Sequence, residues 1–205
     1  SVDVISGVYN CHNNCGFSGG VANMFQEKPK EYFVPKFVNN TALTKKGVDF
    51  FFTRGISQKT ITECKVTTGV MYMPQFQKEV EVIEFNYFRN DELVNVKYRG
   101  AKKSFRMVKD AELIFYGIDD IKDSDWCVIV EGEIDKMSFW EAGVKEVISV
   151  PNGASMSTNA TLEYLDNCID YFENKTKIIL AMDNDEVGMA LRDEIARRLG
   201  LERCY

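Results

Sequence analysis

An apolar run that ends in carboxylates constrains this chain more than any other feature. Residues 126–130 read Trp-Cys-Val-Ile-Val and are followed by Glu131, Gly132, Glu133 and Asp135. A continuous apolar run of this length is typical of a strand that is buried on both faces of a parallel sheet. The sequence therefore predicts a buried strand that delivers acidic side chains to its carboxyl end.

A second stretch has the same pattern further along the chain. The apolar residues 178–182 run into Asp183 and Asp185, and Gly188 follows. Helical and strand patterns alternate around these two stretches, with helices expected over 133–142, 161–173 and 187–199 and a further strand over 147–150. Right-handed crossovers bring the carboxyl ends of parallel strands to one edge of the sheet. We therefore expect Glu131, Asn152 and Asp183 to share that edge.

The acids at this edge have the chemistry of a magnesium site. Carboxylate oxygens are the hard ligands that Mg²⁺ prefers, and Glu131, Asp183 and Asp185 are the candidate ligands. In two-metal phosphoryl transfer the ions lie about 3.5 to 4 Å apart and stabilise the attacking and leaving oxygens. An isolated Asp-x-Asp is commonly a solvated loop, but acids that follow successive strands of this class are a more specific signal. The pattern predicts metal-dependent phosphoryl transfer.

A local reversal of charge precedes the acidic stretches. The whole chain carries a net charge of −6, yet residues 96–109 contain no acid. Alternating segments over 80–88 and 93–99, separated by a polar turn, predict an antiparallel hairpin there. The bases are Lys97, Arg99, Lys102, Lys103, Arg106 and Lys109. Such a face suits phosphate groups, with Tyr98 and Phe105 able to stack on bases; the alternative is a solvated strand edge protected by lysines.

The N-terminal segment resembles half of a zinc ribbon. Cys11 and Cys15, with His12 between them, supply part of the four-ligand set that structural zinc needs, and the other ligand pair is absent. The alternative is a glycine-rich tail. We expect Zn²⁺ to bind only with ligands from outside this chain.

Two short helices are expected next, with Thr44 and Ser57 as their N-caps.

The chain as a whole is expected to have three parts. Residues 1–26 form a partial zinc-ribbon remnant, residues 27–120 a basic α+β subdomain with a small antiparallel sheet, and residues 121–205 a C-terminally truncated α/β domain with a parallel sheet. With 45% hydrophobic and 27% charged residues, the composition is that of an ordinary globular protein. No apolar run is long enough to cross a bilayer and no signal peptide is apparent, so neither secretion nor a membrane partner is expected.

Two motifs resemble a known family. Val130–Asp135 and Met182–Gly188 resemble the acidic motifs of the Toprim domain, and the Glu-Gly-Glu form together with Val150–Ala154 is most similar to phage-type primase-helicases, including the Twinkle-like branch. The ribbon-like start, the element with Arg54–Ser57 and the basic sheet occur in the order that this family uses. The chain is thus identified as a member of that family over most of its length.

The resemblance implies a DNA primase, a nucleotidyltransferase that makes short RNA primers on single-stranded DNA from ribonucleoside triphosphates. It implies that Glu131 is a general base or metal-organising acid, that Asp183 and Asp185 bind Mg²⁺ or Mn²⁺, and that Glu133 and Asp135 support them. The residues that would hold triphosphates or template are Lys97, Arg99, Lys102, Lys103, Arg106 and Asn152. The parent protein would carry a helicase domain and would work in the cytoplasm of a bacterial or phage-infected cell or in an organellar matrix.

The sequence also departs from the family pattern. The ribbon lacks its first ligand pair, the chain stops after 201–205 where a fourth strand would begin, and no Walker A loop occurs. We therefore expect a fragment that is weakly active at most. Two alternatives stay open: a catalytically weak or inactive Toprim module that binds DNA for a replicative helicase, and another Toprim enzyme, a nuclease or a topoisomerase relative. No tyrosine stands out as the nucleophile that a topoisomerase needs.

Overall fold

The computed structural model describes residues 2–3, 8–10, 18–20, 30–36, 43–153 and 162–205. The chain divides into two compact units, residues 1–32 and residues 33–205. In the first unit, three short strands form an antiparallel sheet in the order β1-β2-β3 (Val2–Asp3, Val8–Asn10 and Ser18–Gly20). The predicted zinc ligands Cys11 and Cys15 lie outside the described residues. No helix in the described part of the chain could span a membrane.

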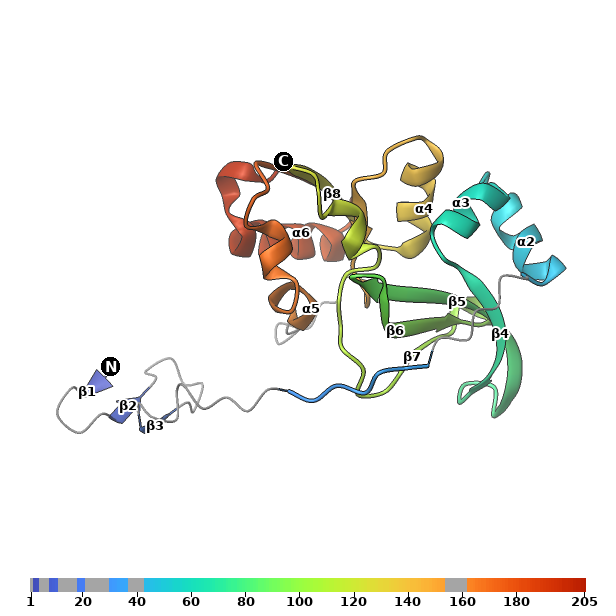
Figure 1. Cartoon of the computed structure of the whole chain (residues 1–205), viewed down its shortest axis with the longest axis horizontal. Helices are drawn as coiled ribbons and strands as arrows, with labels where there is room; N and C mark the ends of the chain where they lie inside the picture. The colour runs from blue at the N-terminus through green and yellow to red at the C-terminus, as the bar shows by residue number, and fades with distance from the viewer. Residues whose placement is uncertain (1, 4–7, 11–17, 21–29, 37–42, 154–161) are drawn as a thin grey trace. The chain divides into compact units, whose positions relative to one another are not determined.

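The second unit contains a four-stranded antiparallel sheet in the order β4-β5-β6-β7 (Figure 1). The predicted hairpin is its centre, because β5 and β6 pair through a tight turn at Asn90 and Asp91. Both turn residues have positive φ, 51° and 62°, which matches the right-handed twist of the paired strands. The strands are β4 (Thr67–Met73), β5 (Lys78–Arg89), β6 (Glu92–Arg99) and β7 (Phe105–Met107).

Two short helices precede this sheet and begin where the sequence predicted. In α2 (Lys45–Phe52) the Thr44 hydroxyl accepts a hydrogen bond from the Gly47 amide, and in α3 (Gln58–Glu63) the Ser57 hydroxyl accepts one from Thr60. Such caps satisfy amides that have no partner inside the helix.

A parallel sheet in the order β10-β8-β9 forms the other half of this unit. Its central strand β8 (Trp126–Val130) pairs with β10 (Lys177–Ala181) and β9 (Val147–Ser149), and α4 (Glu133–Glu141) and α6 (Glu186–Leu199) follow two of the strands. The predicted alternation of parallel strands and helices is confirmed. Beyond α6, the backbone of Tyr205 exchanges hydrogen bonds with Ile178 and Leu180 on the free edge of β10.

The prediction of a single helix over 161–173 is wrong. The structure has α5 (Glu163–Asp166) and then a separate 3-10 turn, η3 (Ile169–Phe172). Arg89 Nη2 donates to the Asn167 carbonyl at 2.7 Å, so an α-helical bond from Tyr171 is replaced by one from Tyr171 to the Cys168 carbonyl. A contact from a distant strand therefore overrides the helical periodicity of this segment.

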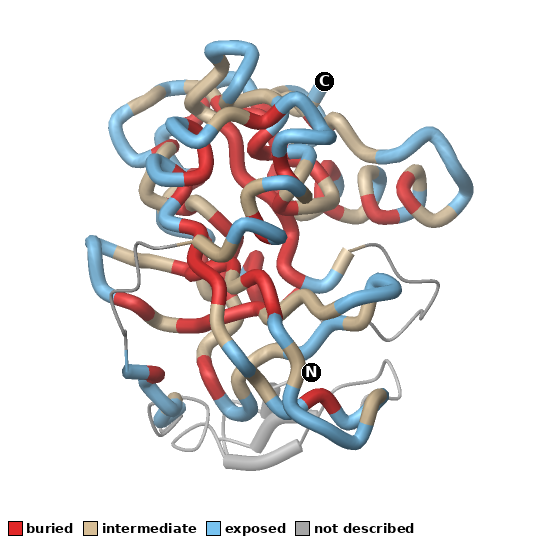
Figure 2. The backbone as a smooth tube through the Cα atoms, turned by 90° about the vertical axis from the view of Figure 1, so that its right-hand side faces the viewer, coloured by how far each residue is buried: buried red, intermediate tan, exposed pale blue. Residues whose placement is uncertain are grey.

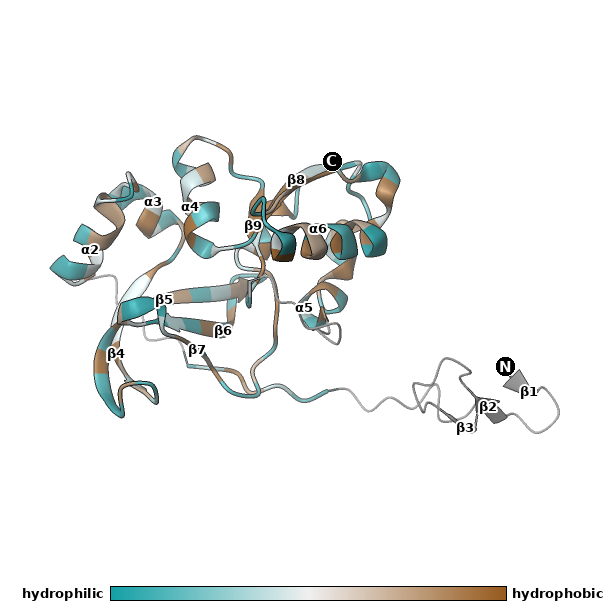
Figure 3. Cartoon of the chain, turned by 180° about the vertical axis from the view of Figure 1, so that it is seen from behind, coloured by the Kyte–Doolittle hydropathy of each residue, from teal (hydrophilic) through white to brown (hydrophobic). Residues whose placement is uncertain are grey.

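One hydrophobic core joins the two sheets of the second unit. Phe85 and Tyr116 from the region of the antiparallel sheet, Ile129 and Ile148 from the parallel sheet, and Leu191 from α6 belong to a single cluster of buried side chains. Figure 2 shows the buried backbone running through the interior, and Figure 3 shows the hydrophobic colouring of β8 and β9. Because the core is continuous, the residues at the junction of the two sheets are held by both.

Candidate active site

A polar hollow of about 880 Å³, here called the main hollow, lies where the carboxyl edge of the parallel sheet meets β6 and β7. Acids line it from one side and bases from the other. The acids are Glu131, Glu133, Asp135 and Asp183, and the bases are Arg54, Lys97, Arg99, Lys103 and Arg106. Asn152 also lines the hollow. The structure thus brings together most of the site residues that the sequence singled out.

The parallel pairing of β8 and β10 positions Glu131 and Asp183. Val130 lies opposite Ala181, so Glu131 and Asp183 leave the sheet at the same edge. Glu131 Oε1 accepts a hydrogen bond of 2.9 Å from the Asp183 amide. This bond fixes the Glu131 carboxylate beside the turn that carries Asp183.

Gly188 makes this arrangement possible. It is buried in the first turn of α6, and a Cβ at this position would overlap the Asp183 carbonyl oxygen and Glu131 Oε1. We therefore expect Gly188→Ala to lower the free energy of unfolding by about 1 to 3 kcal/mol, because overpacking outweighs the better helix propensity of alanine. Urea unfolding should show this loss, whereas Ala190→Ser, an exposed change on the same helix, should change stability little. An increase in stability for Gly188→Ala would contradict the close packing.

Asp185 has a structural contact of its own. Its Oδ1 accepts a hydrogen bond of 2.8 Å from the Gly188 amide and caps α6, and Asp185 does not line the main hollow. An aspartate at this position also interacts favourably with the positive end of the helix dipole. The role of Asp185 as a metal ligand stays a prediction.

Lys97 on β6 and Glu133 at the start of α4 form a buried ion pair. Lys97 Nζ donates to Glu133 Oε1 at 2.8 Å and to the Pro151 carbonyl at 2.7 Å, and Tyr87 donates its hydroxyl to the same carboxylate at 2.5 Å. Both charged side chains are at least 90% buried. The sequence assigned Lys97 to phosphate binding, which stays a prediction; in the structure its ammonium group holds Glu133 and the loop after β9.

Arg99 lies among aromatic rings on the basic side. Its guanidinium carbon is 5.1 Å from the ring centres of both Phe50 and Phe105. Burial lowers the pKa of Arg99, and the neighbouring Arg54 charge lowers it further. Because the positive charges of Arg54 and Arg99 repel each other, an anion placed between them would stabilise both.

Negative charges lie close together on the acidic side of the main hollow. Burial raises the pKa of Asp135, and the charges of Asp183 and Glu133 raise it further. No three histidine, cysteine, aspartate or glutamate side chains within 30–36, 43–153 and 162–205 gather closely enough to hold a metal ion. Mg²⁺ is often bound by only one or two carboxylates together with substrate phosphates and water. The oxygen donors and the repulsion at Asp135 therefore fit a hard cation that binds with its substrate.

The chain resembles known proteins over much of its length. A family model described as Toprim-like matches residues 128–204. A primase homolog protein of Arabidopsis thaliana is 39% identical over 77% of this chain and 48% of its own length. A Twinkle homolog protein of the same plant, described as chloroplastic/mitochondrial, is 35% identical over 99% of this chain and 30% of its own length. Residues 128–204 therefore form a Toprim-like domain, and the chain is related to these two plant proteins.

A solved structure has a similar fold. The crystal structure of the primase fragment of the bacteriophage T7 primase-helicase protein superposes with a TM-score of 0.63 and 22% identity, over 98% of this chain and 81% of that one. The likeness shows that this chain has the Toprim primase fold, in which an antiparallel sheet precedes a parallel one. The chain spans less than half the length of the two plant relatives.

One residue of the main hollow, Arg54, was named in the sequence only as part of a family element and was not assigned to the site. Arg54 follows α2 and lines the main hollow, although it lies more than forty positions before the basic stretch. Its guanidinium group is 3.7 Å from the ring centre of Phe50, and its Nη1 donates to the Phe50 carbonyl. A single base at the end of an aromatic helix carries no spacing signal, so its place in the main hollow is seen only in the fold.

Proposed function

We propose that this chain is the catalytic part of a DNA primase, which joins ribonucleotides on a single-stranded DNA template. The observation that carries the proposal is the main hollow, in which Glu131, Asp135 and Asp183 face Arg99, Lys103 and Arg106. Bases that bind the phosphates of a template and of triphosphates, opposite acids that suit a divalent cation, are what nucleotidyl transfer requires.

The residues of the main hollow divide this work between them. Glu131 and Asp183 would hold Mg²⁺ or Mn²⁺, which supplies positive charge to the phosphate oxygens when bound. Arg99, Lys103 and Arg106 bind and orient the triphosphate and the template. The 3′ oxygen of one nucleotide bonds to the α-phosphorus of the next, the bond to the bridging oxygen breaks, and pyrophosphate leaves. Glu131 accepts the proton of the 3′ hydroxyl, and no protein nucleophile is needed.

A second candidate function is DNA binding without synthesis. It is favoured by the helix cap that engages Asp185. In that case the basic side of the hollow would bind single-stranded DNA for the rest of a longer protein.

Primer synthesis by Glu131→Gln distinguishes the two. Dinucleotide formation from ribonucleoside triphosphates on single-stranded templates, with Mg²⁺ or Mn²⁺, is expected to fall by about 100-fold or more, the scale on which loss of one preorganised electrostatic group slows catalysis. Binding of a fluorescein-labelled oligodeoxynucleotide should not weaken, because the variant removes a negative charge. Glu173→Gln, an exposed change outside the hollow, is the matched control.

Equal synthesis by the wild type and Glu131→Gln would reject the catalytic assignment of this residue. DNA binding with no synthesis by the wild type in either metal would favour the second candidate.

The two plant relatives are much longer than this chain. The Twinkle homolog that the chain resembles is described as chloroplastic/mitochondrial, and the T7 relative is a primase-helicase. We therefore infer a parent protein with a helicase domain that works in an organellar matrix or in a bacterial or phage-infected cytoplasm. Its substrates would be ribonucleoside triphosphates and single-stranded DNA.

A further inference from the structure

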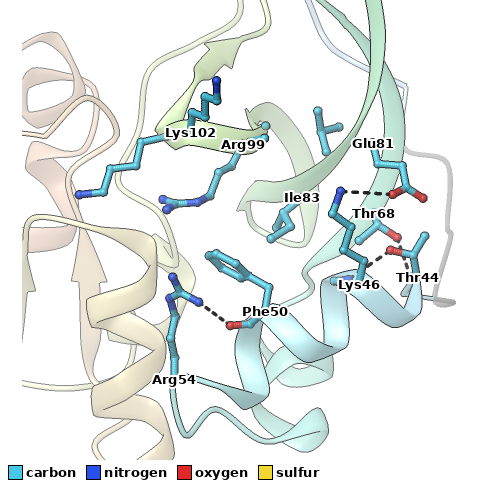
Figure 4. Close-up of a pocket in the computed structure, with 14 residues that line it drawn as sticks. Thr44, Lys46, Phe50, Arg54, Thr68, Glu81, Ile83, Arg99 and Lys102 are labelled. Atoms are coloured by element: carbon cyan, nitrogen blue, oxygen red, sulfur yellow. Dashed lines mark hydrogen bonds and ion pairs between the residues drawn. The ribbon is translucent and has the colours of Figure 1, made fainter.

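A second cavity, here called the side pocket, lies next to the main hollow. It has a volume of about 360 Å³ and lies between α2, the strands β4 and β5, and the turn after β6 (Figure 4). Phe50, Val82 and Ile83 give it an apolar surface, and Figure 4 shows the side chains of Phe50, Arg54 and Arg99 converging there. Cavities of about 300 to 1,000 Å³ with apolar walls and a few polar groups are typical of sites for small molecules or parts of larger ligands.

The charge of the side pocket is strongly positive. Its cations are Lys46, Arg54, Arg99, Lys102 and Lys103, and its acid is Glu81. Glu81 lies 3.9 Å from Lys46 in an exposed pair. The other four cations make no ion pair with any residue in the described ranges, so an anionic ligand is the complement that this pocket lacks.

The turn after β6 holds two of these cations in an unusual conformation. Lys102 and Lys103 both have a backbone φ of 55°. Residues other than glycine rarely adopt this left-handed conformation. Strained backbone of this kind tends to occur where it places functional groups. Here it places two consecutive exposed lysines at the side pocket, and Lys103 also lines the main hollow.

We propose that the side pocket binds one nucleotide of single-stranded DNA that passes through the main hollow. The base would lie against Phe50 and Ile83, and Lys102 and Lys103 would bind the adjoining phosphate. Aromatic and guanidinium groups stack on any base, and lysines follow the backbone. The two cavities share Arg54, Arg99 and Lys103, so a continuous strand can reach both. The proposal rests on the proposed function in one respect, that the chain binds single-stranded DNA.

Photocrosslinking locates this nucleotide. An oligodeoxynucleotide with one 5-iododeoxyuridine is irradiated with the protein, and the tryptic peptides are identified by mass spectrometry. Cleavage after Lys46 and Arg54 gives the peptide Gly47–Arg54, which holds Phe50. We expect the crosslink on Phe50 at one position of the label along the strand. Crosslinks confined to other peptides, at every position of the label, would overturn the proposal.

Filling the pocket tests the same point without removing a charge. Ala101 is exposed and lines the side pocket, whereas Val70 is exposed on β4 and lines neither cavity. Ala101→Phe should abolish the Phe50 crosslink and weaken binding of a labelled oligodeoxythymidine about 10-fold, on the scale measured for loss of one stacked base. Val70→Phe should do neither. Unchanged binding and crosslinking by Ala101→Phe would overturn the proposal.

A competition experiment identifies the source of the nucleotide. Unlabelled single-stranded DNA should displace the crosslink, and free ribonucleoside triphosphates at the same nucleotide concentration should not; displacement by triphosphates alone would overturn the assignment to the DNA strand. These outcomes are separate from primer synthesis. If the wild type makes no primer but crosslinks at Phe50, the proposed activity is rejected and the proposed nucleotide site is kept. If it makes primers but never crosslinks at Phe50, the nucleotide site is rejected and the proposed activity is kept.

Discussion

Lys97→Met is expected to lower the free energy of unfolding by about 3 to 5 kcal/mol, the usual cost of removing one partner from a buried ion pair. The variant leaves the Glu133 carboxylate buried with Tyr87 as its hydrogen-bond donor. It also leaves the Pro151 carbonyl without the bond from Lys97 Nζ. Uncompensated charge in a region of low polarity is the main cost, because Met fills much of the volume of the lysine stem.

A double-mutant cycle measures this effect. Urea unfolding is compared for the wild type, Lys97→Met, Glu133→Gln and the double variant. The double variant should recover a large part of the stability that Lys97→Met loses, because no unpaired charge remains. Losses that simply add would show that the pair does not interact. Lys109→Met, at an exposed residue on the same basic stretch, serves as the control.

Lys136→Met is expected to have the second largest effect, a loss of about 3 kcal/mol at neutral pH, since its partner keeps some contact with water. Lys136 is fully buried on α4, with its Nζ 2.8 Å from Asp120 Oδ2 and 3.9 Å from the ring centre of Trp140. The variant removes the ion pair and the cation–π contact together. Thermal or urea unfolding measures the loss, and Lys122→Met, at an exposed lysine, should change stability little.

The loss for Lys136→Met should also depend on pH. Burial raises the pKa of Asp120, and Lys136 partly opposes this rise. Without Lys136, the pKa of Asp120 in the folded state should rise further above its unfolded value. The folded state then binds a proton that the unfolded state does not, so stability increases as the pH falls through this interval. The difference between wild type and variant should shrink on acidification; a difference that grows would contradict the pairing.

The sequence predicted the acidic edge because two independent periodic signals coincide there. The apolar runs before Glu131 and Asp183 show where two parallel strands end. Right-handed crossovers then bring both strand ends, and therefore both acids, to one edge of the sheet. The hairpin turn at Asn90 and the helix caps at Thr44 and Ser57 were readable for a similar reason: each depends on chemistry within a few residues.

The contacts that escaped prediction join distant parts of the chain. Lys97 and Glu133 are 36 positions apart, so a stretch without acids looked like a free basic face although its most buried base has an acidic partner. The break in the helix expected over 161–173 has the same origin, because Arg89 binds the Asn167 carbonyl from another element. Local periodicity carries no information on such partners.

The continuous core has a consequence for the shape of the main hollow. The basic and acidic walls of the main hollow rest on one packed interior rather than on separate lobes with a hinge between them. Packed interiors resist compression, so the spacing between the walls is set when the chain folds. The nucleic acid strand proposed above would therefore fit a gap of preset width, because the ordering cost is met during folding, before any ligand arrives.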